Sequence, residues 1–198
     1  MFHLFETIRI EDGVPQHLSW HQSRLNESYT RYFKRHGGPV LEEVIRVPAE
    51  YSEGIVKCRF LYNRSAHTSE FSHYSPRKIR SLKLVKGDHI GYSMKYTARD
   101  SIQQLFGRRE DCDDILIIQK GRITDTSYTN IVLFNGENWI TPIYPLLEGT
   151  CRARLTSEGR IREGDIRVED LEHYRHFRLI NAMLDFDAQE DVDVARIK

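Results

Sequence analysis

The sequence has few cysteines and no excess of either charge. Its 198 residues include 3 cysteines, which form no CxxC pair and no cluster with histidine. A disulfide framework and a metal site are therefore not expected, and a reducing compartment fits. Lys and Arg together number 29, and Asp and Glu also number 29, so the formal net charge is +0. Without a basic stripe, nucleic acid is not an expected partner.

Long apolar runs are also missing. No segment reaches the length of a membrane-spanning helix, and the start MFHLFETIRIEDG lacks the basic residues and apolar stretch of a signal peptide. We therefore expect a cytoplasmic chain with no membrane partner. A net charge near zero lowers colloidal solubility, and it is better tolerated when a second subunit covers part of the surface. The sequence thus favours a homodimer.

The pattern of strands and helices predicts an α+β fold of two lobes. In the first lobe, residues 1–86, FETIRI alternates like a strand, EDG marks a turn and VPQHL returns as its partner. Ser19 is the expected N-cap of a long helix, WHQSRLNESYTRYFKR, which ends before HGGP. A short helix, VLEEVIRV, and three strand-like runs, GIVKCRFLYN, SEFSHYS and RSLKLV, follow. Helices packed on an antiparallel sheet are expected here.

The second lobe, residues 87–198, begins with another set of strands. These are DDILIIQ, GRITDT and NIVLFNGENWIT, the last with an Asn-Gly turn signal. PLLEGTCRARLTSEG predicts a helix that begins near Gly149 and Thr150 and ends at Gly159. A strand, a short helix and a strand complete the lobe, in IREGDIRV, VEDLEHY and FRLINAM. The tail EDVDVARIK is expected to be loosely held.

Lys95 and Asp125 are the candidate residues for chemistry. A lysine becomes a nucleophile or a proton carrier when burial and nearby positive charge lower its pKa, and Arg99 is such a neighbour of Lys95 in the sequence. A carboxylate such as Asp125 can hold the proton on a ring nitrogen. Each residue has a plainer alternative, because Lys95 can be a surface lysine and Asp125 can bond its own turn.

Several residues are candidates for an anion or a substrate carboxylate. Arg24 offers a planar guanidinium to phosphate oxygens, although a helix arginine can also simply face solvent. His21 shares its helix face and is expected to make a structural hydrogen bond. Lys57 and Arg59 alternate onto one face of a strand, where they either receive substrate carboxylates or lie exposed. Further phosphate donors are expected from two turns, in Ser127, Tyr128, Thr129, Ala182 and Met183.

An amine, a carboxylate and phosphate donors are together the groups that pyridoxal 5'-phosphate (PLP) needs. Their order resembles the class IV, or fold type IV, PLP enzymes. FETIRIEDGVPQHLSWHQSRLNES is similar to the family's opening strand, hairpin and His-x-x-Arg-Leu helix, whose arginine binds the cofactor phosphate; here it is Arg24. The family's Schiff-base lysine falls on Lys95, and its Val-Ser/Thr-Glu turn matches Ile123-Thr124-Asp125. LEGTCR and LINAM match two later elements, so the resemblance spans nearly the whole chain.

The sequence departs from the family pattern in several places. Nothing precedes MFHLFETIRI that matches the family's first strand, and the chain is shorter than is usual for the family. Asp125 stands where the family has glutamate, one methylene longer. Asp100 stands where the aminotransferases have a tyrosine beside the cofactor's phenolic oxygen, with Tyr92 or Tyr96 as possible replacements.

The resemblance implies a PLP enzyme that acts on a small amino substrate. The opening and the LINAM segment look closest to aminodeoxychorismate lyase, which implies release of pyruvate to form 4-aminobenzoate, with Lys95 moving the proton. A class IV aminotransferase acting on branched-chain or D-amino acids is the alternative. A binding protein that has kept the fold after losing catalysis is the second alternative.

Overall fold

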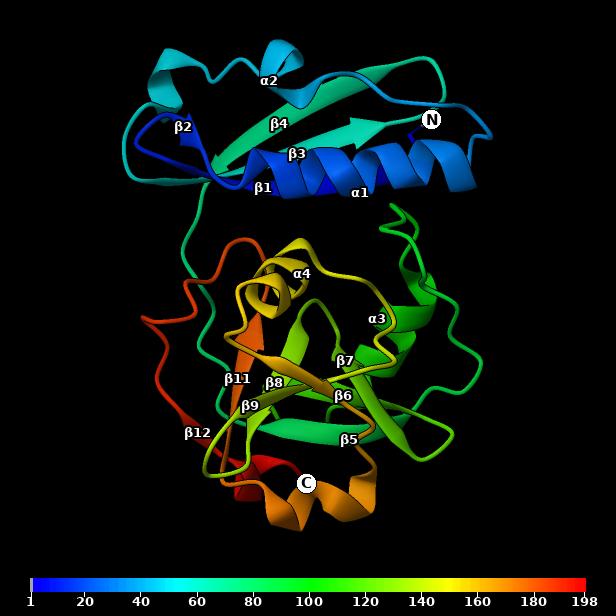
Figure 1. Ribbon diagram of the computed structural model, residues 1–198, viewed down its shortest axis with the longest axis vertical. Coiled ribbons are helices and arrows are strands. Elements are labelled where there is room, and N and C mark those ends of the chain that lie inside the picture. The colour runs from blue at the N-terminus through cyan, green and yellow to red at the C-terminus, as the bar shows by residue number, and fades with distance from the viewer. Residues whose placement is uncertain (1) are drawn as a thin grey trace. The chain divides into compact units, whose positions relative to one another are not determined.

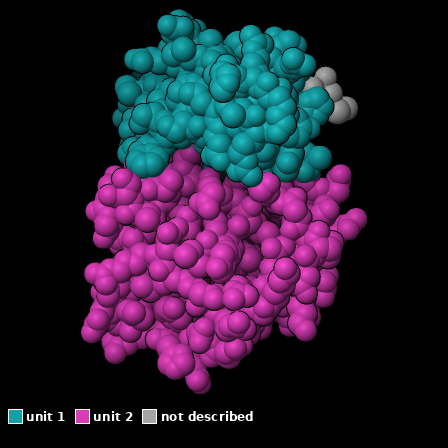
Figure 2. All heavy atoms as spheres, turned by 45° about the vertical axis from the view of Figure 1, so that its right-hand side comes forward, with its two compact units in different colours: residues 1–76, 94–98 teal, residues 77–93, 99–198 magenta. Residues whose placement is uncertain are grey.

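The computed structural model describes residues 2–198, which form two compact units. Of the described residues, the first unit comprises 2–76 and Met94–Ala98, and the second comprises Arg77–Ser93 and Arg99–Lys198, coloured teal and magenta in Figure 2. Met1, part of the first expected lobe, lies outside the described residues. The expected lobe boundary after residue 86 stays a prediction, and the compact units differ from it in two segments: residues 77–86 belong to the second unit, and Met94–Ala98 belongs to the first.

The first unit contains one antiparallel sheet, in the order β2-β1-β3-β4. Its elements are β1 Leu4–Glu11, β2 Val14–Pro15, α1 Leu18–Arg31, α2 Leu41–Val44, the 3-10 turn η1 Ala49–Tyr51, β3 Ile55–Tyr62 and β4 His67–His73. The expected hairpin, helices and first two strands of this region are therefore present, whereas the third expected strand, RSLKLV, lies in the second unit. Figure 1 shows α1 running along the sheet.

The core of the first unit lies between α1 and the sheet. Side chains at Leu4, Ile8 and Ile10 of β1 are fully buried together with alternate residues of β3, as the two-residue period of a strand requires. Helix α1 contributes positions spaced by three or four residues, including Leu25 and Tyr29. The sheet and α1 thus bury their apolar faces against each other, and the opposite face of each remains outside this core.

Two expectations for α1 were wrong. The helix begins at Leu18, and its N-cap is His17 in the left-handed conformation (φ 53°), so Ser19 lies inside the first turn. The helix ends at Arg31, before the expected HGGP stop. After the helix, the chain passes close to α1 at Gly38, where a Cβ would lie 2.3 Å from the Leu25 side chain. Only glycine leaves room for this close approach.

The second unit contains two sheets, ordered β5-β6-β7 and β10-β9-β8-β11-β12. Its strands are β5 Leu82–Lys86, β6 Asp114–Gln119, β7 Arg122–Thr126, β8 Asn130–Phe134, β9 Trp139–Pro142, β10 Arg162–Gly164, β11 His176–Ile180 and β12 Val192–Asp193. The helices are α3 Asp100–Phe106, α4 Thr150–Ser157, and the 3-10 turns η2 Val168–His173 and η3 Val194–Arg196. One apolar core joins both sheets, from Leu116 on β6 to Phe177 on β11.

The C-terminal tail is held rather than loose, so that expectation was wrong. The Lys198 amide donates to the Leu82 carbonyl (2.9 Å), and the Leu84 amide donates to the Lys198 carbonyl (2.7 Å). These bonds place the last residues along the edge of β5, where they cover groups that an edge strand would otherwise expose.

Helix α3 was also not expected.

Among residues 2–198, no helix is long and apolar enough to cross a membrane. The same residues contain no group of three or more His, Cys, Asp or Glu side chains arranged to hold a metal ion.

Candidate functional site

The backbone of Lys95 is fixed to the edge of β1 in the first unit. The Phe5 amide donates to the Lys95 carbonyl (3.0 Å), and the Thr97 amide donates to the His3 carbonyl (2.9 Å). Met94 and Tyr96 on either side pack against the core of this unit. Lys95 is therefore held by strand-like pairing on both sides, although its segment lies far from β1 in the sequence.

The Phe5 ring brings two of the predicted cations together. Lys95 Nζ lies 4.9 Å from the centre of this ring, and the Arg59 guanidinium carbon lies 5.2 Å from it. Both distances suit attraction of a cation to an aromatic face. Arg59 also pairs with Glu70 (2.8 Å). Arg59 therefore shares an aromatic partner with Lys95, and the predicted influence of Arg99 on Lys95 stays a prediction.

Lys57 lies two residues before Arg59 and on the same sheet face, as predicted. The alternate residues of β3 are buried, so Lys57 and Arg59 both point away from the core. Lys57 lies opposite Arg9 in the register of β1 and β3. A role for either residue with substrate carboxylates stays a prediction.

Arg24 is not a solvent-exposed helix arginine, because it pairs with Glu6 of β1. Its Nε donates to Glu6 Oε1 (3.0 Å), and its Nη2 donates to Glu6 Oε2. His21, one helical turn earlier, contacts the same carboxylate through Nδ1 (2.8 Å). The exposed fractions are 0% for Glu6, 1% for His21 and 13% for Arg24, so α1 and β1 share a buried polar cluster.

The charge of this cluster is set by Arg24. Burial by itself raises the pKa of Glu6, but the Arg24 charge and the hydrogen bonds from His21 and Arg24 outweigh it and lower the pKa to about 2. Burial lowers the pKa of His21, and the Arg24 and Lys95 charges act in the same direction against the opposing effect of Glu6. A neutral His21 therefore donates a hydrogen bond from its Nδ1–H to the ionised Glu6 carboxylate.

Sequence reasoning missed Glu6. The signal was available, because Glu6 stands between Leu4 and Ile8 at the inward positions of an alternating strand. An acid at a core position needs a partner, since an isolated buried carboxylate is very unfavourable. His21 and Arg24 on one helix face were the matching partners.

Asp125 lies at a bulge of β7 in the second unit. Leu116 pairs with Thr126 and Ile118 pairs with Ile123, so Thr124 and Asp125 together face one residue of β6. The Thr124 hydroxyl donates to the Ile117 carbonyl there (2.7 Å). Bulges redirect side chains and are frequent beside active sites.

Both carboxylate oxygens of Asp125 accept a hydrogen bond. Oδ1 accepts from Asn130 Nδ2 (2.8 Å), and Oδ2 accepts from the Leu147 amide (2.9 Å). Burial raises the pKa of Asp125 to about 7, against the opposing hydrogen bonds and the charge of Arg152. Each oxygen has a second lone pair, so the group can accept a further bond from a ring N–H.

The turn that contains Ser127, Tyr128 and Thr129 is closed by its own hydrogen bonds. Thr126 Oγ1 accepts from the amides of Thr129 (3.1 Å) and Tyr128 (3.4 Å). The Arg99 guanidinium donates to the Ser127 carbonyl, and the Arg77 guanidinium lies 4.4 Å from the Tyr128 ring centre. The predicted role of these three residues in phosphate binding stays a prediction, and in the structure two of their amides already bond the turn.

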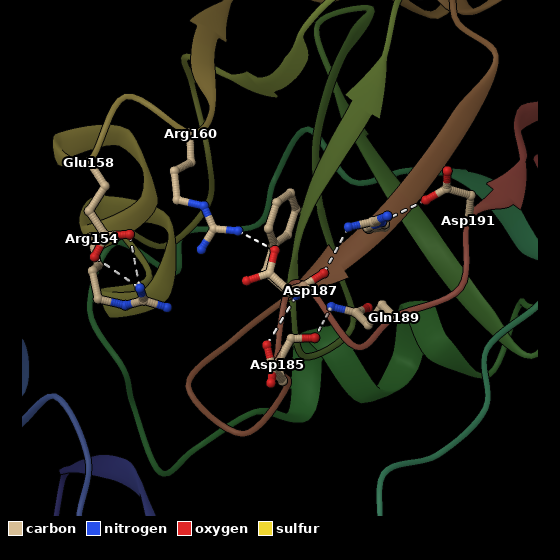
Figure 3. Close-up of polar contacts among 9 residues, drawn as sticks. Arg154, Glu158, Arg160, Asp185, Asp187, Gln189 and Asp191 are labelled. Carbon is tan, nitrogen blue, oxygen red and sulfur yellow. Dashed lines mark hydrogen bonds and ion pairs between the residues drawn. The ribbon is translucent and has the colours of Figure 1, made fainter.

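Ala182 and Met183 lie in the loop from β11 to β12. The Met183 amide donates to Asn181 Oδ1 (2.8 Å). Figure 3 shows how the rest of this loop is anchored, with Asp187 paired to Arg160 and Asp191 reached by an arginine of the sheet. That arginine is Arg178, which also donates to the Phe186 carbonyl (2.8 Å). Two arginines outside the loop, Arg160 and Arg178, therefore hold it in place. Phosphate binding by Ala182 and Met183 stays a prediction.

Helix α4 begins where the sequence predicted, with Gly149 as its N-cap and Thr150 as its first residue. The first bond from this end joins the Ala153 amide to the Gly149 carbonyl. The amides of Thr150, Cys151 and Arg152 precede it and have no acceptor within the helix. A helix end of this kind favours an anion.

The predicted residues thus fall into two groups. The first unit holds Lys95, Arg24, Lys57 and Arg59, with Lys95 and Arg59 on one aromatic ring and Arg24 on Glu6. The second unit holds Asp125 and the two predicted phosphate turns. Tyr96 packs in the first core, whereas Tyr92 lies in the second unit beside Arg99.

A profile of the family described as Amino-transferase class IV matches residues 3–186. The chain belongs to the class IV amino-transferase family. An uncharacterized protein from Haemophilus influenzae is 36% identical over 185 residues, which cover 92% of this chain and 98% of that protein.

Solved structures agree with this family. The crystal structure of a candidate 4-amino-4-deoxychorismate lyase from Haemophilus somnus is 37% identical, with a TM-score of 0.86, and the match covers 92% of this chain and 97% of that one. A PLP-bound hypothetical aminotransferase from Mycobacterium tuberculosis has a TM-score of 0.78 at 18% identity, covering 99% of this chain and 81% of that one. The mixed fold is thus that of the fold type IV enzymes, and the chain is an enzyme of this PLP-dependent family.

The side chains present suit the cofactor that the family implies. The first unit supplies an amine at Lys95 and a guanidinium that Glu6 holds in place. The second supplies a buried carboxyl group with remaining lone pairs and a helix N-terminus for an anion. Amine, acid and anion donors are the set that PLP requires.

Proposed function

We propose that this chain binds PLP and catalyses the reaction of an aminodeoxychorismate lyase, releasing pyruvate and forming 4-aminobenzoate. The observation that carries this proposal is the 37% identity, over 92% of this chain, to the candidate lyase from Haemophilus somnus. The presence of Lys95, Arg24 and Asp125 supports it. PLP, when bound, draws electrons from the carbon beside the substrate amine through its protonated ring.

Each residue has a defined task in this reaction. Lys95 would hold the cofactor covalently through Nζ until the substrate amine takes its place, and the freed Nζ would then accept the proton from the carbon next to that amine. Asp125 keeps the proton on the ring nitrogen through a carboxylate oxygen. Arg24 binds the phosphate, and its bonds to Glu6 fix the plane of its guanidinium. Arg59 and Lys57 receive substrate carboxylates.

The experiment begins with the absorption spectrum of purified protein with and without added PLP, followed by borohydride reduction and peptide mapping. We expect PLP to be fixed to Lys95 after reduction, and Lys95→Arg to abolish this, with Lys57→Arg as the matched control that retains it. A protein that stays colourless with PLP would contradict the proposal and favour a binding protein without catalysis.

A second step separates the lyase from an aminotransferase. Incubation with 4-amino-4-deoxychorismate is expected to release pyruvate, measured by a coupled dehydrogenase assay. Branched-chain and D-amino acids serve as the comparison set. One outcome would contradict the lyase activity and indicate an aminotransferase. In that outcome, one of these donors converts the cofactor to its pyridoxamine form, and 4-amino-4-deoxychorismate releases no pyruvate. The predicted homodimer and cytoplasmic location stay predictions.

A further inference from the structure

Asn130, the first residue of β8, joins three segments of the second unit. Its Nδ2 donates to Asp125 Oδ1 of β7 (2.8 Å) and to the Leu147 carbonyl in the loop before α4 (2.9 Å). A carboxamide nitrogen has two hydrogens, so one group serves both acceptors. Because both neighbours are acceptors, the nitrogen and not the oxygen of the amide must face them.

The chain leaves space for this side chain at Gly149. A Cβ at position 149 would lie 2.0 Å from Asn130 Oδ1. The backbone of Gly149, at φ −69° and ψ 139°, is one that any residue adopts. Glycine is therefore required here for space rather than for conformation, and what fills that space is the Asn130 amide.

Asn130 is the side-chain donor to Asp125, and the groups that bond this carboxyl group directly are neutral. The backbone amides of Leu147 (2.9 Å) and Leu146 also donate to this carboxyl group. The charged neighbour is Arg152 of α4, which is itself paired with Glu148 (2.8 Å) and Glu163 (2.6 Å). Burial raises the pKa of Asp125, and the Asn130 bond is the largest influence in the opposite direction.

We propose that Asn130 is a positioning residue for Asp125: its amide group fixes the carboxylate and ties it to the loop that begins α4. One side chain then sets both the acid assigned to the ring nitrogen and the helix start that suits a phosphate. The role at the cofactor depends on the proposed function, whereas the effect on Asp125 is a property of the protein without cofactor. The two are therefore tested separately.

The first test is a titration of Asp125 in the cofactor-free protein. Carboxyl ¹³C signals of labelled aspartate are followed with pH, and Asp125→Asn identifies the signal. Asn130→Ala removes a hydrogen bond to the ionised form, so the Asp125 titration is expected to move upward by about one to two pH units. Asn135→Ala is the matched control, since Asn135 bonds the Glu137 and Asn138 amides in the β8–β9 turn. An unchanged titration in folded Asn130→Ala would overturn the proposal.

Gly149→Ala provides a second test that does not remove Asn130. The new methyl group displaces the Asn130 amide, so the Asp125 titration is expected to move in the same direction as in Asn130→Ala. In a double variant with Asn130→Ala, the change at Gly149 is expected to add nothing. Equal shifts from Gly149→Ala in both backgrounds would contradict a route through Asn130. If Asn130→Ala does not fold, the single Gly149→Ala titration decides, and no shift overturns the proposal.

Binding of PLP then distinguishes the two hypotheses. Failure of the wild-type protein to take up PLP contradicts the proposed function but leaves the cofactor-free titrations as the decisive measurement for Asn130. If PLP binds, Asn130→Ala is expected to change the pH dependence of its visible absorption while Asn135→Ala does not.

Discussion

Glu6 in the first unit and Asp125 in the second are both buried carboxyl groups, yet their surroundings have opposite effects. Glu6 faces the Arg24 charge and two side-chain donors, and its pKa falls to about 2 despite burial. Asp125 faces a side-chain amide group and two backbone N–H groups, and burial raises its pKa to about 7. Neutral donors do not offset the loss of solvation as a directly paired cation does.

The difference matches the tasks proposed for the two groups. A carboxylate that must hold an arginine in place works best when it stays ionised over the whole physiological range. A carboxyl group that is to keep a proton on a ring nitrogen has to be ionised beside that ring, and the positive charge of the ring would itself lower the raised pKa of Asp125. Glu6 is therefore suited to structure and Asp125 to chemistry.

The largest expected effect comes from removing the Glu6 charge. Glu6→Gln leaves the largely buried Arg24 without its carboxylate, and we expect a loss of about 3–5 kcal/mol in the free energy of unfolding. Urea unfolding at pH 7 measures it. Glu70→Gln is the matched control, because the Glu70 and Arg59 pair is exposed and is expected to contribute under about 1 kcal/mol. Equal losses in the two variants would refute the contrast.

The pH dependence of stability should have opposite slopes for the two acids. Asp125, raised from 3.8 to about 7, contributes stability below pH 3.8 that is lost as the pH rises to about 7, on the order of 4 kcal/mol. Glu6, lowered from 4.5 to about 2, contributes stability above pH 4.5 that is lost as the pH falls to 2, about 3 kcal/mol.

Unfolding curves between pH 2 and 8 measure both slopes. Asp125→Asn is expected to remove the decline between pH 4 and 7, and Glu6→Gln is expected to remove the decline below pH 4.5. The comparison fails if either variant keeps the slope of the wild-type protein in its own range.

His21 tests the neutral part of the Glu6 environment. His21→Leu removes one hydrogen bond to an ionised acceptor, so we expect a loss of about 1.5–3 kcal/mol at pH 7. His21→Asn places an amide nitrogen near the position of Nδ1 and should recover part of this. Thermal unfolding measures both variants. Equal stability of the Leu and Asn variants would show that packing, and not the bond to Glu6, accounts for the effect.

Local patterns made much of this fold predictable. The alternation of β3 placed Lys57 and Arg59 on one face, the Asn135-Gly136 signal lies between β8 and β9, and α4 begins at the expected Gly149 and Thr150. The His21 and Arg24 spacing placed both on one face of α1. These features depend on neighbours in the sequence, so the sequence alone contains them.

The rest depends on pairings between distant segments. The return of Lys95 to β1, the bulge at Asp125 and the tail along β5 are set by partners up to 116 positions away, in the Lys198 to Leu82 bond. Glu6 was the exception, because its inward position in β1 was visible but its need for a partner was not used. Helix α3 was missed because its seven residues give only a short apolar pattern, Ile102 and Leu105.

The smallest expected effect concerns the exposed counterpart of the Glu6 pair. Arg160 bonds Asp187, whose side chain is 70% exposed, in the loop shown in Figure 3, and Arg160 also lies 5.0 Å from the Phe186 ring. Arg160→Gln is expected to lower the free energy of unfolding by under about 1 kcal/mol, because solvent screens the pair. Arg160→Met retains the aliphatic stem on Phe186 and should lose less than Gln if packing dominates. Raising the salt concentration should weaken this pair but leave the Glu6 and Arg24 pair nearly unchanged, since screening acts chiefly on exposed charges. The free energy of unfolding is therefore compared at low and high salt for Glu6→Gln and Arg160→Gln. An equal change with salt in the two variants would show that burial does not distinguish the two carboxylates.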